Sequence, residues 1–278
     1  MSHDFKKGVR TQRISTVAID ISEVKREISL VDPEDYKNYY TEYSNGGWRT
    51  CMLANQSGDA DSHRIEASKG GARLTRVGNR LTYLTGLISN WFDRSALVYA
   101  RLIKTQPGSI VFPHRDYLDF EGELVRIHIP LKTNSRFLHS ESDLVFHMKQ
   151  GEVWYLDATN LHAAANLGRS IRYALVLDFH CSNHITDCLR DDNLISLRYP
   201  DSVHRREYNR QEIVSKLRDT YAQSGLDGIL YAASALNFSN RSHAIQTYDW
   251  VEEVLLHRGD EKDLRSFNVL KQKFLFTG

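Results

Sequence analysis

The sequence is poor in cysteine and proline, and it lacks any long hydrophobic run. Three cysteines and five prolines occur among 278 residues. So few cysteines, in an odd number, do not build a disulfide framework, and free thiols are typical of a reducing compartment. No apolar stretch approaches the roughly 18 residues that a membrane-spanning helix needs, and the N-terminus lacks the apolar region of a signal peptide. We therefore expect a cytoplasmic protein without a membrane partner.

An excess of one charge sign is also missing. Lys and Arg total 36 and Asp and Glu total 35, which gives a formal net charge of +1. Proteins that cover nucleic acid or anionic membranes usually carry a clear basic excess, so we expect no nucleic-acid partner. The composition is 41% hydrophobic, which suffices for a sizeable core in one large domain, with or without a smaller appendage.

Short β-rich runs occupy the middle of the chain. From residue 97 to about residue 180, apolar and β-branched runs alternate with the turn residues Gly, Asn, Ser and Asp. Several short strands at this spacing predict a sandwich or a barrel-like sheet. No amphipathic segment of helix length interrupts them, which disfavours a parallel βαβ arrangement.

Strand and helix signals also precede this β-rich region. The patterns predict a strand within residues 10–20, a short helix capped by Ser22, a strand between two Gly-containing turns, and a helix over residues 75–92. The two turns contain Asn45-Gly46-Gly47 and Ser57-Gly58. The N-terminal part is therefore expected to add flanking strands and helices to the β core.

The chain changes character after about residue 185. The apolar spacing becomes helical, and Gly225 and Gly259 stand where helices are expected to end. We predict a β domain in residues 1–185, including its N-terminal flanking elements, and a C-terminal helical subdomain in residues 186–278.

The stretch VFPHRDYLDF holds a pattern with chemical meaning. His114 and Asp116 lie two residues apart in a predicted strand, so their side chains share one face while Arg115 points away. His162 follows a later strand end and a short polar loop. Two histidines and one carboxylate form the facial triad that binds Fe(II) and leaves open coordination positions. We predict this triad, against the alternative that the three are polar residues in ordinary hydrogen bonds.

A second group of potential ligands has a less suitable spacing. Cys181 and Cys188 lie near His180 and His184, but the cysteines are seven residues apart. Zinc sites usually pair ligands two to four residues apart. We therefore interpret these cysteines as free thiols.

Cationic residues on neighbouring predicted strands indicate that an anion is bound. Arg172 lies ten residues beyond His162 in the next strand, where a hairpin would bring it beside that histidine. A guanidinium can donate two charge-assisted hydrogen bonds to a carboxylate, such as the far end of a 2-oxo diacid. We predict that Arg172 is the anchor for such a carboxylate, against the alternative of a surface ion pair.

Arg126 and His128 share one face of another predicted strand. Burying such groups is costly unless they meet an anion or another partner. Two interpretations stay open at this point: the pair lines the same cavity, or it simply pairs with Glu123 or Asp143.

Together, three motifs resemble a known type of enzyme: PHRDYLDF, RIHIPL and LHSESDLVFHMKQGEVWYLDATNLHAAANLGRSIRYALVLDF. They are similar to the bacterial L-proline 3-hydroxylase type, within the aspartyl/asparaginyl β-hydroxylase branch of the Fe(II)/2-oxoglutarate-dependent dioxygenases. The upstream segment EYSNGGWRTCMLANQSG extends the similarity, which runs from about residue 40 to 180. The resemblance implies a double-stranded β-helix (jelly-roll, cupin-like) core. It also implies Fe(II), 2-oxoglutarate as co-substrate, O2, and ascorbate as an aid in vitro.

The resemblance further implies roles for single residues. The iron ligands would be His114, Asp116 and His162, and no other catalytic side chain is required. Arg172 would bind the far carboxylate of 2-oxoglutarate, and His128 would contact its C1 carboxylate side. Arg126 would contact either the co-substrate or the substrate carboxylate, and His139 is assigned to the substrate.

The function expected from this resemblance is O2-dependent hydroxylation of a free L-amino acid, with release of succinate and CO2. The candidate substrates are of the proline, pipecolate, lysine or citrulline type, the setting is specialised metabolism, and a homodimer is compatible with the resemblance. One alternative is a hydroxylase of a peptide, protein or carrier-bound residue with the same chemistry. Another is a non-enzymatic cupin-like sensor of a dicarboxylate.

Overall fold

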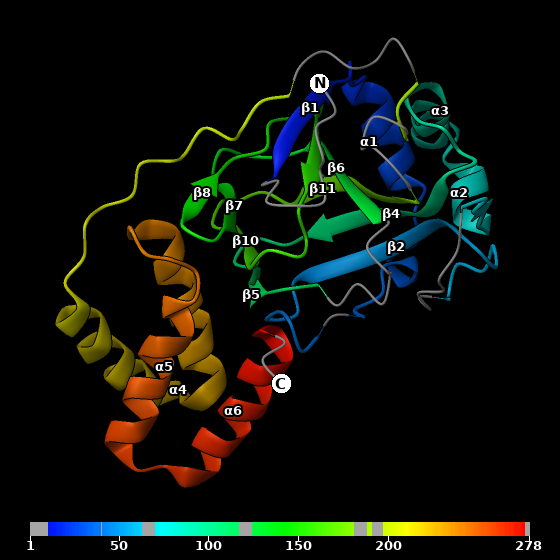
Figure 1. Cartoon of the computed structure of the whole chain (residues 1–278). Coiled ribbons are helices and arrows are strands. Elements are labelled where there is room, and N and C mark those ends of the chain that lie inside the picture. The colour runs from blue at the N-terminus through cyan, green and yellow to red at the C-terminus, as the bar shows by residue number, and fades with distance from the viewer. Residues whose placement is uncertain are drawn as a thin grey trace.

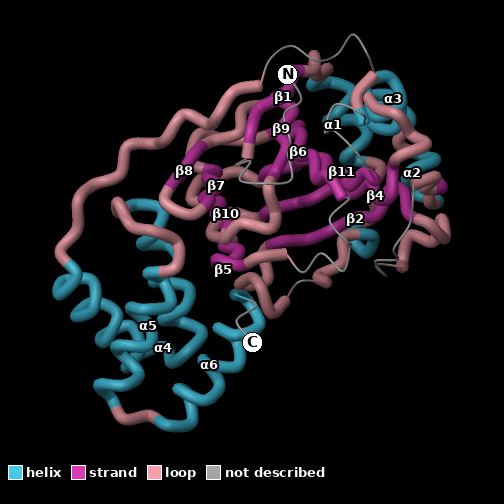
Figure 2. The backbone as a smooth tube through the Cα atoms, in the orientation of Figure 1, coloured by secondary structure: helices cyan, strands magenta, loops and turns pink. Residues whose placement is uncertain are grey.

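The structure, a computed structural model, describes residues 11–39, 41–62, 70–116, 124–180, 188–190 and 197–275. Two antiparallel β-sheets face each other, and helices lie on both sides of this pair (Figure 1). The helices that follow residue 209 gather in a separate layer at one end of the molecule, whereas the strands occupy the other part (Figure 2).

Within the described residues, seven strands form the larger sheet, which we call the major sheet. Each strand is antiparallel to its neighbours. In order across the sheet they are β1 (Gln12–Thr16), β9 (Glu152–Leu156), β6 (Leu124–Lys132), β11 (Arg172–His180), β4 (Leu97–Thr105), β2 (Trp48–Asn55) and β3 (Arg73–Leu74).

Four strands of the described chain form the smaller sheet, which we call the minor sheet. These strands are also antiparallel to their neighbours. In order they are β5 (Ile110–His114), β10 (His162–Asn166), β7 (Phe137–Glu141) and β8 (Leu144–Phe146).

The path of the chain between the sheets defines the fold. From β4 to β11 the chain crosses repeatedly between the major and the minor sheet, and only the β7–β8 hairpin stays within one sheet. Two antiparallel sheets wound in this way form a jelly roll. The predicted double-stranded β-helix is therefore confirmed, with β1 added at one edge of the major sheet and β2 and β3 at the other.

The two faces of the major sheet differ because side chains alternate along each strand. On the outer face, buried aliphatic side chains such as Leu102, Ile127 and Leu177 share one core with the N-terminal helices. On the inner face, the same strands carry polar residues such as Arg101 and His128, which line a cavity between the sheets. The alternation thus places an apolar core on the outer face of the major sheet and the polar lining of the cavity on its inner face.

The first helix, α1 (Ile21–Ser29), confirms the prediction of a helix there but corrects its cap. Its N-cap is Asp20, whose carboxylate accepts hydrogen bonds from the backbone N–H groups of Ser22 and Glu23. Ser22 was the wrong prediction because it already lies within the first turn, and a capping residue must precede the helix. A short 3-10 helix, η1 (Pro33–Asp35), follows.

The predicted helix over residues 75–92 is two helices, α2 (Arg76–Arg80) and α3 (Thr82–Trp91). The chain leaves helical geometry at Leu81, which has φ −98° and ψ 66°. The buried carboxylate of Glu27 accepts hydrogen bonds from the N–H groups of Tyr83 and Leu84 at the start of α3. Satisfying those N–H groups from another helix requires a new helix start, which the apolar spacing does not reveal.

The C-terminal part consists of α4 (Arg210–Ser239), α5 (Gln246–Arg258) and α6 (Glu261–Leu275). Gly259 ends α5 in the left-handed conformation, as predicted. Gly225 has φ +63° and ψ −157°, which is not helical, so the predicted helix end at this glycine is confirmed. The element α4 therefore consists of two helices joined by a kink at Gly225.

The C-terminal helices share their apolar core with the outer face of the minor sheet. Phe112 and Ala163 of that sheet belong to the same buried cluster as Tyr248 and Trp250 of α5 and Phe274 of α6. Such a shared core ties the helices to the strands that carry the predicted metal ligands. A boundary near residue 185 remains a prediction.

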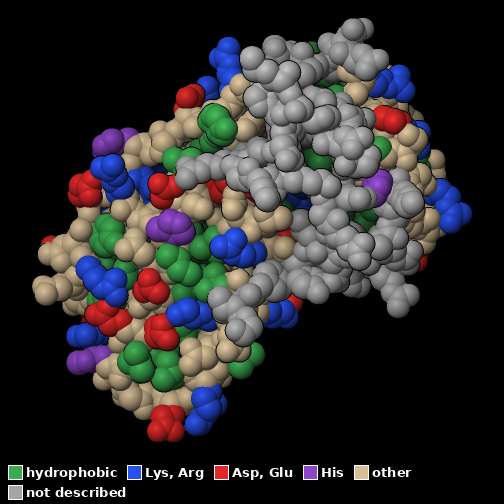
Figure 3. Space-filling model, viewed as in Figure 1, with side chains coloured by type: hydrophobic (Ala, Val, Ile, Leu, Met, Phe, Trp, Pro, Cys, Tyr) green, Lys and Arg blue, Asp and Glu red, His purple; other side chains and the backbone are tan. Residues whose placement is uncertain are grey.

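The remaining expectations concern membrane spans, the charged surface and the cysteines. None of the described helices combines the length and the apolar character needed to cross a membrane. Side chains of Lys and Arg are interspersed with those of Asp and Glu on the face shown in Figure 3. Cys51 and Cys188 are buried and form no disulfide within the described residues. Cys181 and His184 lie outside the described residues, so the interpretation of their cluster stays a prediction.

Candidate active site

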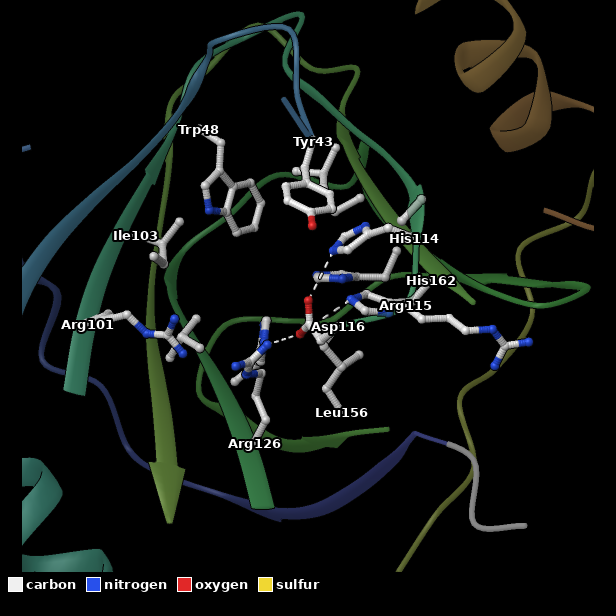
Figure 4. Close-up of a pocket in the computed structure, with 16 residues that line it drawn as sticks. Tyr43, Trp48, Arg101, Ile103, His114, Arg115, Asp116, Arg126, Leu156 and His162 are labelled. Atoms are coloured by element: carbon white, nitrogen blue, oxygen red, sulfur yellow. Dashed lines mark hydrogen bonds and ion pairs between the residues drawn. The ribbon is translucent and has the colours of Figure 1, made fainter. Parts of the chain in front are cut away.

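A cavity of about 230 Å³ lies between the inner faces of the two sheets (Figure 4). The three predicted ligands stand on one side of the cavity. Trp48, Ile103 and Arg101 stand across from them. The lining includes His114, Asp116, His162, Arg101, Arg126, His128, His139, Tyr43, Trp48, Ile103 and Val111.

The structure brings the three predicted ligands together. His114 ends β5, Asp116 follows two residues later, and His162 begins the neighbouring strand β10. The two imidazole rings lie 4.4 Å apart between centroids. One potential ligand atom from each of the three residues lies within 4.8 Å of the other two, as a single metal ion requires. The predicted constellation is therefore present.

A bulge in β5 gives His114 its position. His162 pairs with His114, but Ala164 pairs with Val111, so three residues of β5 span the length of two residues of β10. Pro113 lies within this irregular stretch, where the missing N–H of proline is tolerated because β5 is an edge strand. Bulges redirect side chains next to functional sites. Here the bulge points His114 into the cavity beside His162.

Backbone carbonyls orient both imidazoles. Nδ1 of His114 lies 2.8 Å from the carbonyl oxygen of Phe112, and Nδ1 of His162 lies 2.9 Å from that of Asn160. A carbonyl oxygen can only accept, so each Nδ1 carries the hydrogen and each Nε2 offers a lone pair. Both Nε2 atoms face Asp116, at 3.2 Å for His114 and 3.9 Å for His162.

The electrostatic surroundings favour the protonation states that bind metals. Burial, and then the neighbouring His114, lower the pKa of His162 to about 4, so its imidazole is neutral near pH 7. Burial alone would raise the pKa of the Asp116 carboxyl, but Arg126 together with the two histidines holds that pKa well below its usual range. Neutral imidazole and ionised carboxylate are the forms that coordinate a metal.

A second layer of hydrogen bonds holds the loop before His162. The carboxylate of Asp157 accepts hydrogen bonds from Thr159 Oγ1 at 2.6 Å and from Asn160 Nδ2 at 2.9 Å. The same side-chain amide of Asn160 donates to Glu141 at 3.1 Å. Asn160 then holds His162 through its own carbonyl oxygen, so this network orients a predicted ligand.

Arg126 links the triad to the opposite sheet. It donates to the Asp116 carboxylate, and its Nε donates to Asp178 Oδ1 at 2.7 Å. Arg101 of β4 donates to the other oxygen of Asp178. Asp178 thus lies between two guanidinium groups that face the cavity. The sequence interpretation did not identify Asp178 or Arg101, because their partners lie on separate strands.

Arg172 lies in a different place from the one predicted. A β10–β11 hairpin was expected to set it beside His162, but β10 belongs to the minor sheet and β11 to the major sheet. Consecutive strands of a jelly roll alternate between sheets, so the two residues sit on opposing sheets. The Arg172 side chain is 0% exposed, and its guanidinium carbon lies 4.0 Å from the centroid of the Phe137 ring.

Arg172 is a buried cation without a hydrogen-bonding partner in the described part of the chain. Its Nε and both Nη atoms are buried and make no hydrogen bond there. Burial lowers its pKa to about 9, which still leaves it charged at neutral pH. Nearby, burial and then Arg172 hold the pKa values of His128 and His139 well below their usual range. This pocket therefore pairs one charged donor with two neutral imidazoles.

The aromatic wall comes from a turn that docks on β5. The side chain of Asn45 donates to the carbonyl of Gly108 at 2.8 Å and accepts from the N–H of Ile110 at 2.9 Å. A Cβ on Gly47 would lie 1.8 Å from Ser109 Oγ, so only glycine fits there. This turn sets Tyr43 and Trp48 over the cavity, where Figure 4 shows both rings. The Asn-Gly-Gly signal indicated the turn but not its target.

Comparison with known proteins places the chain in a family. The family model described as Aspartyl/Asparaginyl beta-hydroxylase matches residues 12–181. The chain is 27% identical over 269 residues to an L-proline cis-4-hydroxylase of Rhizobium meliloti (strain 1021), covering 95% of each chain. It is 31% identical over 258 residues to L-proline cis-3-hydroxylase 2 of Streptomyces sp, covering 86% of this chain and 88% of the relative.

These matches span most of the chain and include the strands that carry the triad, Arg126 and Arg172. They confirm the expected enzyme class and the expected cofactors, Fe(II), 2-oxoglutarate and O2. The chain belongs to the aspartyl/asparaginyl β-hydroxylase family, and it is a 2-oxoglutarate-dependent dioxygenase.

Proposed function

We propose that this enzyme hydroxylates a free L-amino acid in the cytoplasm, with conversion of 2-oxoglutarate to succinate and CO2. One observation carries the proposal. A metal-competent triad lines the cavity together with His128 and His139, whose pKa values are lowered by burial and then by the guanidinium of Arg172, a residue of the major sheet without a described hydrogen-bond partner. The names of the relatives, which are L-proline hydroxylases, support a free amino acid as the substrate.

In this proposal His114, Asp116 and His162 hold the iron. The donor set of two neutral imidazoles and one carboxylate suits Fe(II) and leaves positions open. Bound there, iron supplies the activation of O2 that oxidises an otherwise inert C–H bond. The chain itself orients the three ligands through the carbonyls of Phe112 and Asn160.

Arg172 anchors the far carboxylate of 2-oxoglutarate. A buried cation without a partner is costly, and a bound carboxylate removes most of that cost through charge-assisted hydrogen bonds. His128 contacts the C1 carboxylate side as a neutral donor. The surroundings of His139 support the same co-substrate rather than the amino acid, because its ring lies 5.8 Å from that of His128 and 5.2 Å from that of Phe137.

Arg101 and Arg126 receive the carboxylate of the amino acid. Both line the cavity, and Asp178 holds both from behind. Opposite the triad, Trp48 and Ile103 form an apolar wall. A compact apolar side chain fits this wall better than a charged or amide-bearing one, so proline or pipecolate is favoured over lysine or citrulline.

Two finer expectations belong to this proposal, the cytoplasmic location and a homodimer. The first rests on the reducing compartment that the cysteine content indicates. The second rests only on the resemblance noted from the motifs. Membership of a hydroxylase family argues against the non-enzymatic sensor.

Succinate release tests the proposal directly. Anaerobically purified protein is given Fe(II), ascorbate, 2-oxoglutarate and O2, with a panel of proline, pipecolate, lysine, citrulline, arginine, ornithine and leucine. We expect succinate above the background with a compact apolar member and a product heavier by one oxygen atom. The variant His162→Ala is the control without metal. Succinate release that occurs only with peptide or carrier-bound substrates would contradict a free amino acid.

A further inference from the structure

The last turn of α6 reaches the metal-binding strand. The backbone N–H of Arg115 donates to the carbonyl oxygen of Phe274 at 2.9 Å. Arg115 stands between His114 and Asp116 in the sequence. The C-terminal helix is therefore hydrogen-bonded to the peptide that separates two of the proposed ligands, almost 160 residues away along the chain.

A line of aromatic rings leads from α6 into the site. The ring of Phe274 lies 5.0 Å from that of Tyr43, and the ring of Tyr43 lies 5.1 Å from that of His114. Phe274 is 0% exposed, and its ring is also 6.4 Å from that of Phe112 of β5. Figure 4 shows the Tyr43 ring directly above His114. One side chain of α6 thus supports both the wall of the cavity and a metal ligand.

Neighbouring contacts fix the same two segments. The hydroxyl of Tyr248 in α5 donates to the carbonyl oxygen of Pro113, within the bulge of β5. Lys273 pairs with Glu42 at 2.6 Å, and its ammonium lies 5.8 Å from the centroid of the Tyr43 ring. The helices therefore hold β5 and the Tyr43 segment together from the outside.

We propose that Phe274 is a positioning residue for the reaction, through which the C-terminal helices set the geometry of His114 and of the Tyr43 wall. The part that concerns the substrate rests on the proposed function. The part that concerns the metal rests only on the triad. Groups that orient a metal ligand from outside typically change metal affinity by roughly 10- to 100-fold when removed.

The first test measures metal binding by the full-length chain without turnover. Co(II) is titrated anaerobically into wild type, Phe274→Leu and Phe267→Leu, and its visible absorption is followed. Phe267 is the matched control, because it is also a fully buried phenylalanine of α6, whereas the described ring contacts with Tyr43 and Phe112 are made by Phe274. We expect Phe274→Leu to weaken Co(II) binding about tenfold and Phe267→Leu to change it less than about twofold.

The second test separates the wall from the metal. With saturating Fe(II), we expect Phe274→Leu to raise the KM for the amino acid about tenfold and to increase succinate formed without hydroxylated product. Tyr43→Leu should produce the same change. The double variant should add little, because both substitutions remove one line of contacts.

Equal effects of Phe274→Leu and Phe267→Leu on Co(II) affinity would overturn the proposal, as would additive effects of Phe274→Leu and Tyr43→Leu. If Phe274→Leu does not fold, Phe274→Met takes its place, because it removes the ring and keeps a large apolar side chain. Unchanged Co(II) affinity in a folded Phe274→Met protein would then overturn the proposal. A wild type that binds Co(II) but hydroxylates no amino acid would contradict the proposed function. The effect of Phe274 on the metal site would still be tested by the Co(II) affinities of Phe274→Leu and Phe267→Leu.

Discussion

The two sheets supply different chemistry to one cavity. The minor sheet carries the metal-competent histidines His114 and His162, each oriented by a backbone carbonyl. The major sheet carries cations, namely Arg101, Arg126 and Arg172. The proposed metal binding and the proposed anion binding therefore reside on separate layers, so a substitution on one sheet should remove one function and spare the other.

Two aspartates pair with arginines of the major sheet. Asp116 follows the minor sheet and pairs with Arg126 of the major sheet. Asp178 pairs with two arginines within the major sheet. Arg172, by contrast, has no described hydrogen-bond partner of either kind.

The largest effect is expected from His162→Ala on the minor sheet. It removes a proposed ligand, so metal affinity should fall by more than about 100-fold and hydroxylation should be lost, while the fold persists. Equilibrium dialysis with Fe(II) or Co(II) and circular dichroism check these results. His147→Ala is the control, since His147 is a half-buried histidine that contacts the carbonyl of Phe137 at 2.8 Å. Wild-type metal affinity in His162→Ala would refute the triad.

Arg172→Met breaks the anion side alone. Loss of a buried charged partner should weaken 2-oxoglutarate binding roughly 100-fold, with Co(II) affinity unchanged within about threefold. The ligand-free variant should be at least as stable as wild type, because an uncompensated buried charge disappears. Calorimetric titration and thermal unfolding measure both quantities. Arg115→Met is the control, since its guanidinium donates to the carbonyl of Thr159 and points away from the triad (Figure 4). Unaltered 2-oxoglutarate affinity in Arg172→Met would contradict the proposed role of Arg172 as the carboxylate anchor.

Asp178→Asn should act on the substrate rather than on the metal. Without the carboxylate, Arg101 and Arg126 lose their shared partner, so the KM for the amino acid should rise about tenfold while Co(II) affinity changes little. Stability should fall by about 1–3 kcal/mol, because the buried Arg101 loses a charged partner while Arg126 keeps Asp116. Steady-state kinetics and urea unfolding measure this, with Asp178→Glu as the partial rescue. A larger rise in the dissociation constant for Co(II) than in the KM for the amino acid would contradict a role of Asp178 at the substrate site.

The smallest effect is a pH dependence at Glu141. Burial raises the pKa of its carboxyl above the ordinary 4.5. The folded state therefore binds this proton more tightly than the unfolded state does, and the associated stability is present below about pH 4.5 and is lost as pH rises through the raised pKa. Glu141→Gln cannot lose a proton.

The difference in Tm, Glu141→Gln minus wild type, should consequently grow more positive from about pH 4 upward and then level off. We expect a span of about 2–4 °C. Differential scanning fluorimetry at several pH values measures it, with the exposed Glu34→Gln as a flat control. A difference that becomes more negative with rising pH would contradict the burial of an acid whose charge is unfavourable.

Local patterns in the sequence predicted the strands of the β core and two of the three proposed metal ligands. The i, i+2 spacing of His114 and Asp116 encodes a shared face, and alternation with turn residues encodes the strands. The path between sheets is not encoded locally. For that reason Arg172 was expected on a hairpin with His162, although the motif resemblance led to the same proposed role.

Missed residues share one physical property, a partner that is distant in the sequence. Asp178 gains its meaning from arginines on β4 and β6, and Glu27 caps α3 from another helix. Tyr43 faces the cavity only because the turn at Asn45 docks on β5. Hydrophobic spacing and capping rules do not report such contacts, because they describe each element by itself.

The bond between Arg115 and Phe274 has a consequence for biosynthesis. A ribosome makes β5 almost 160 residues before the last turn of α6, so β5 is synthesised well before the helix that contacts it. Pairing of distant strands is also a slow step in folding. The contact between Arg115 and Phe274 can therefore form only once the chain has been made through α6, so we expect the complete site to assemble later than the strand that carries His114.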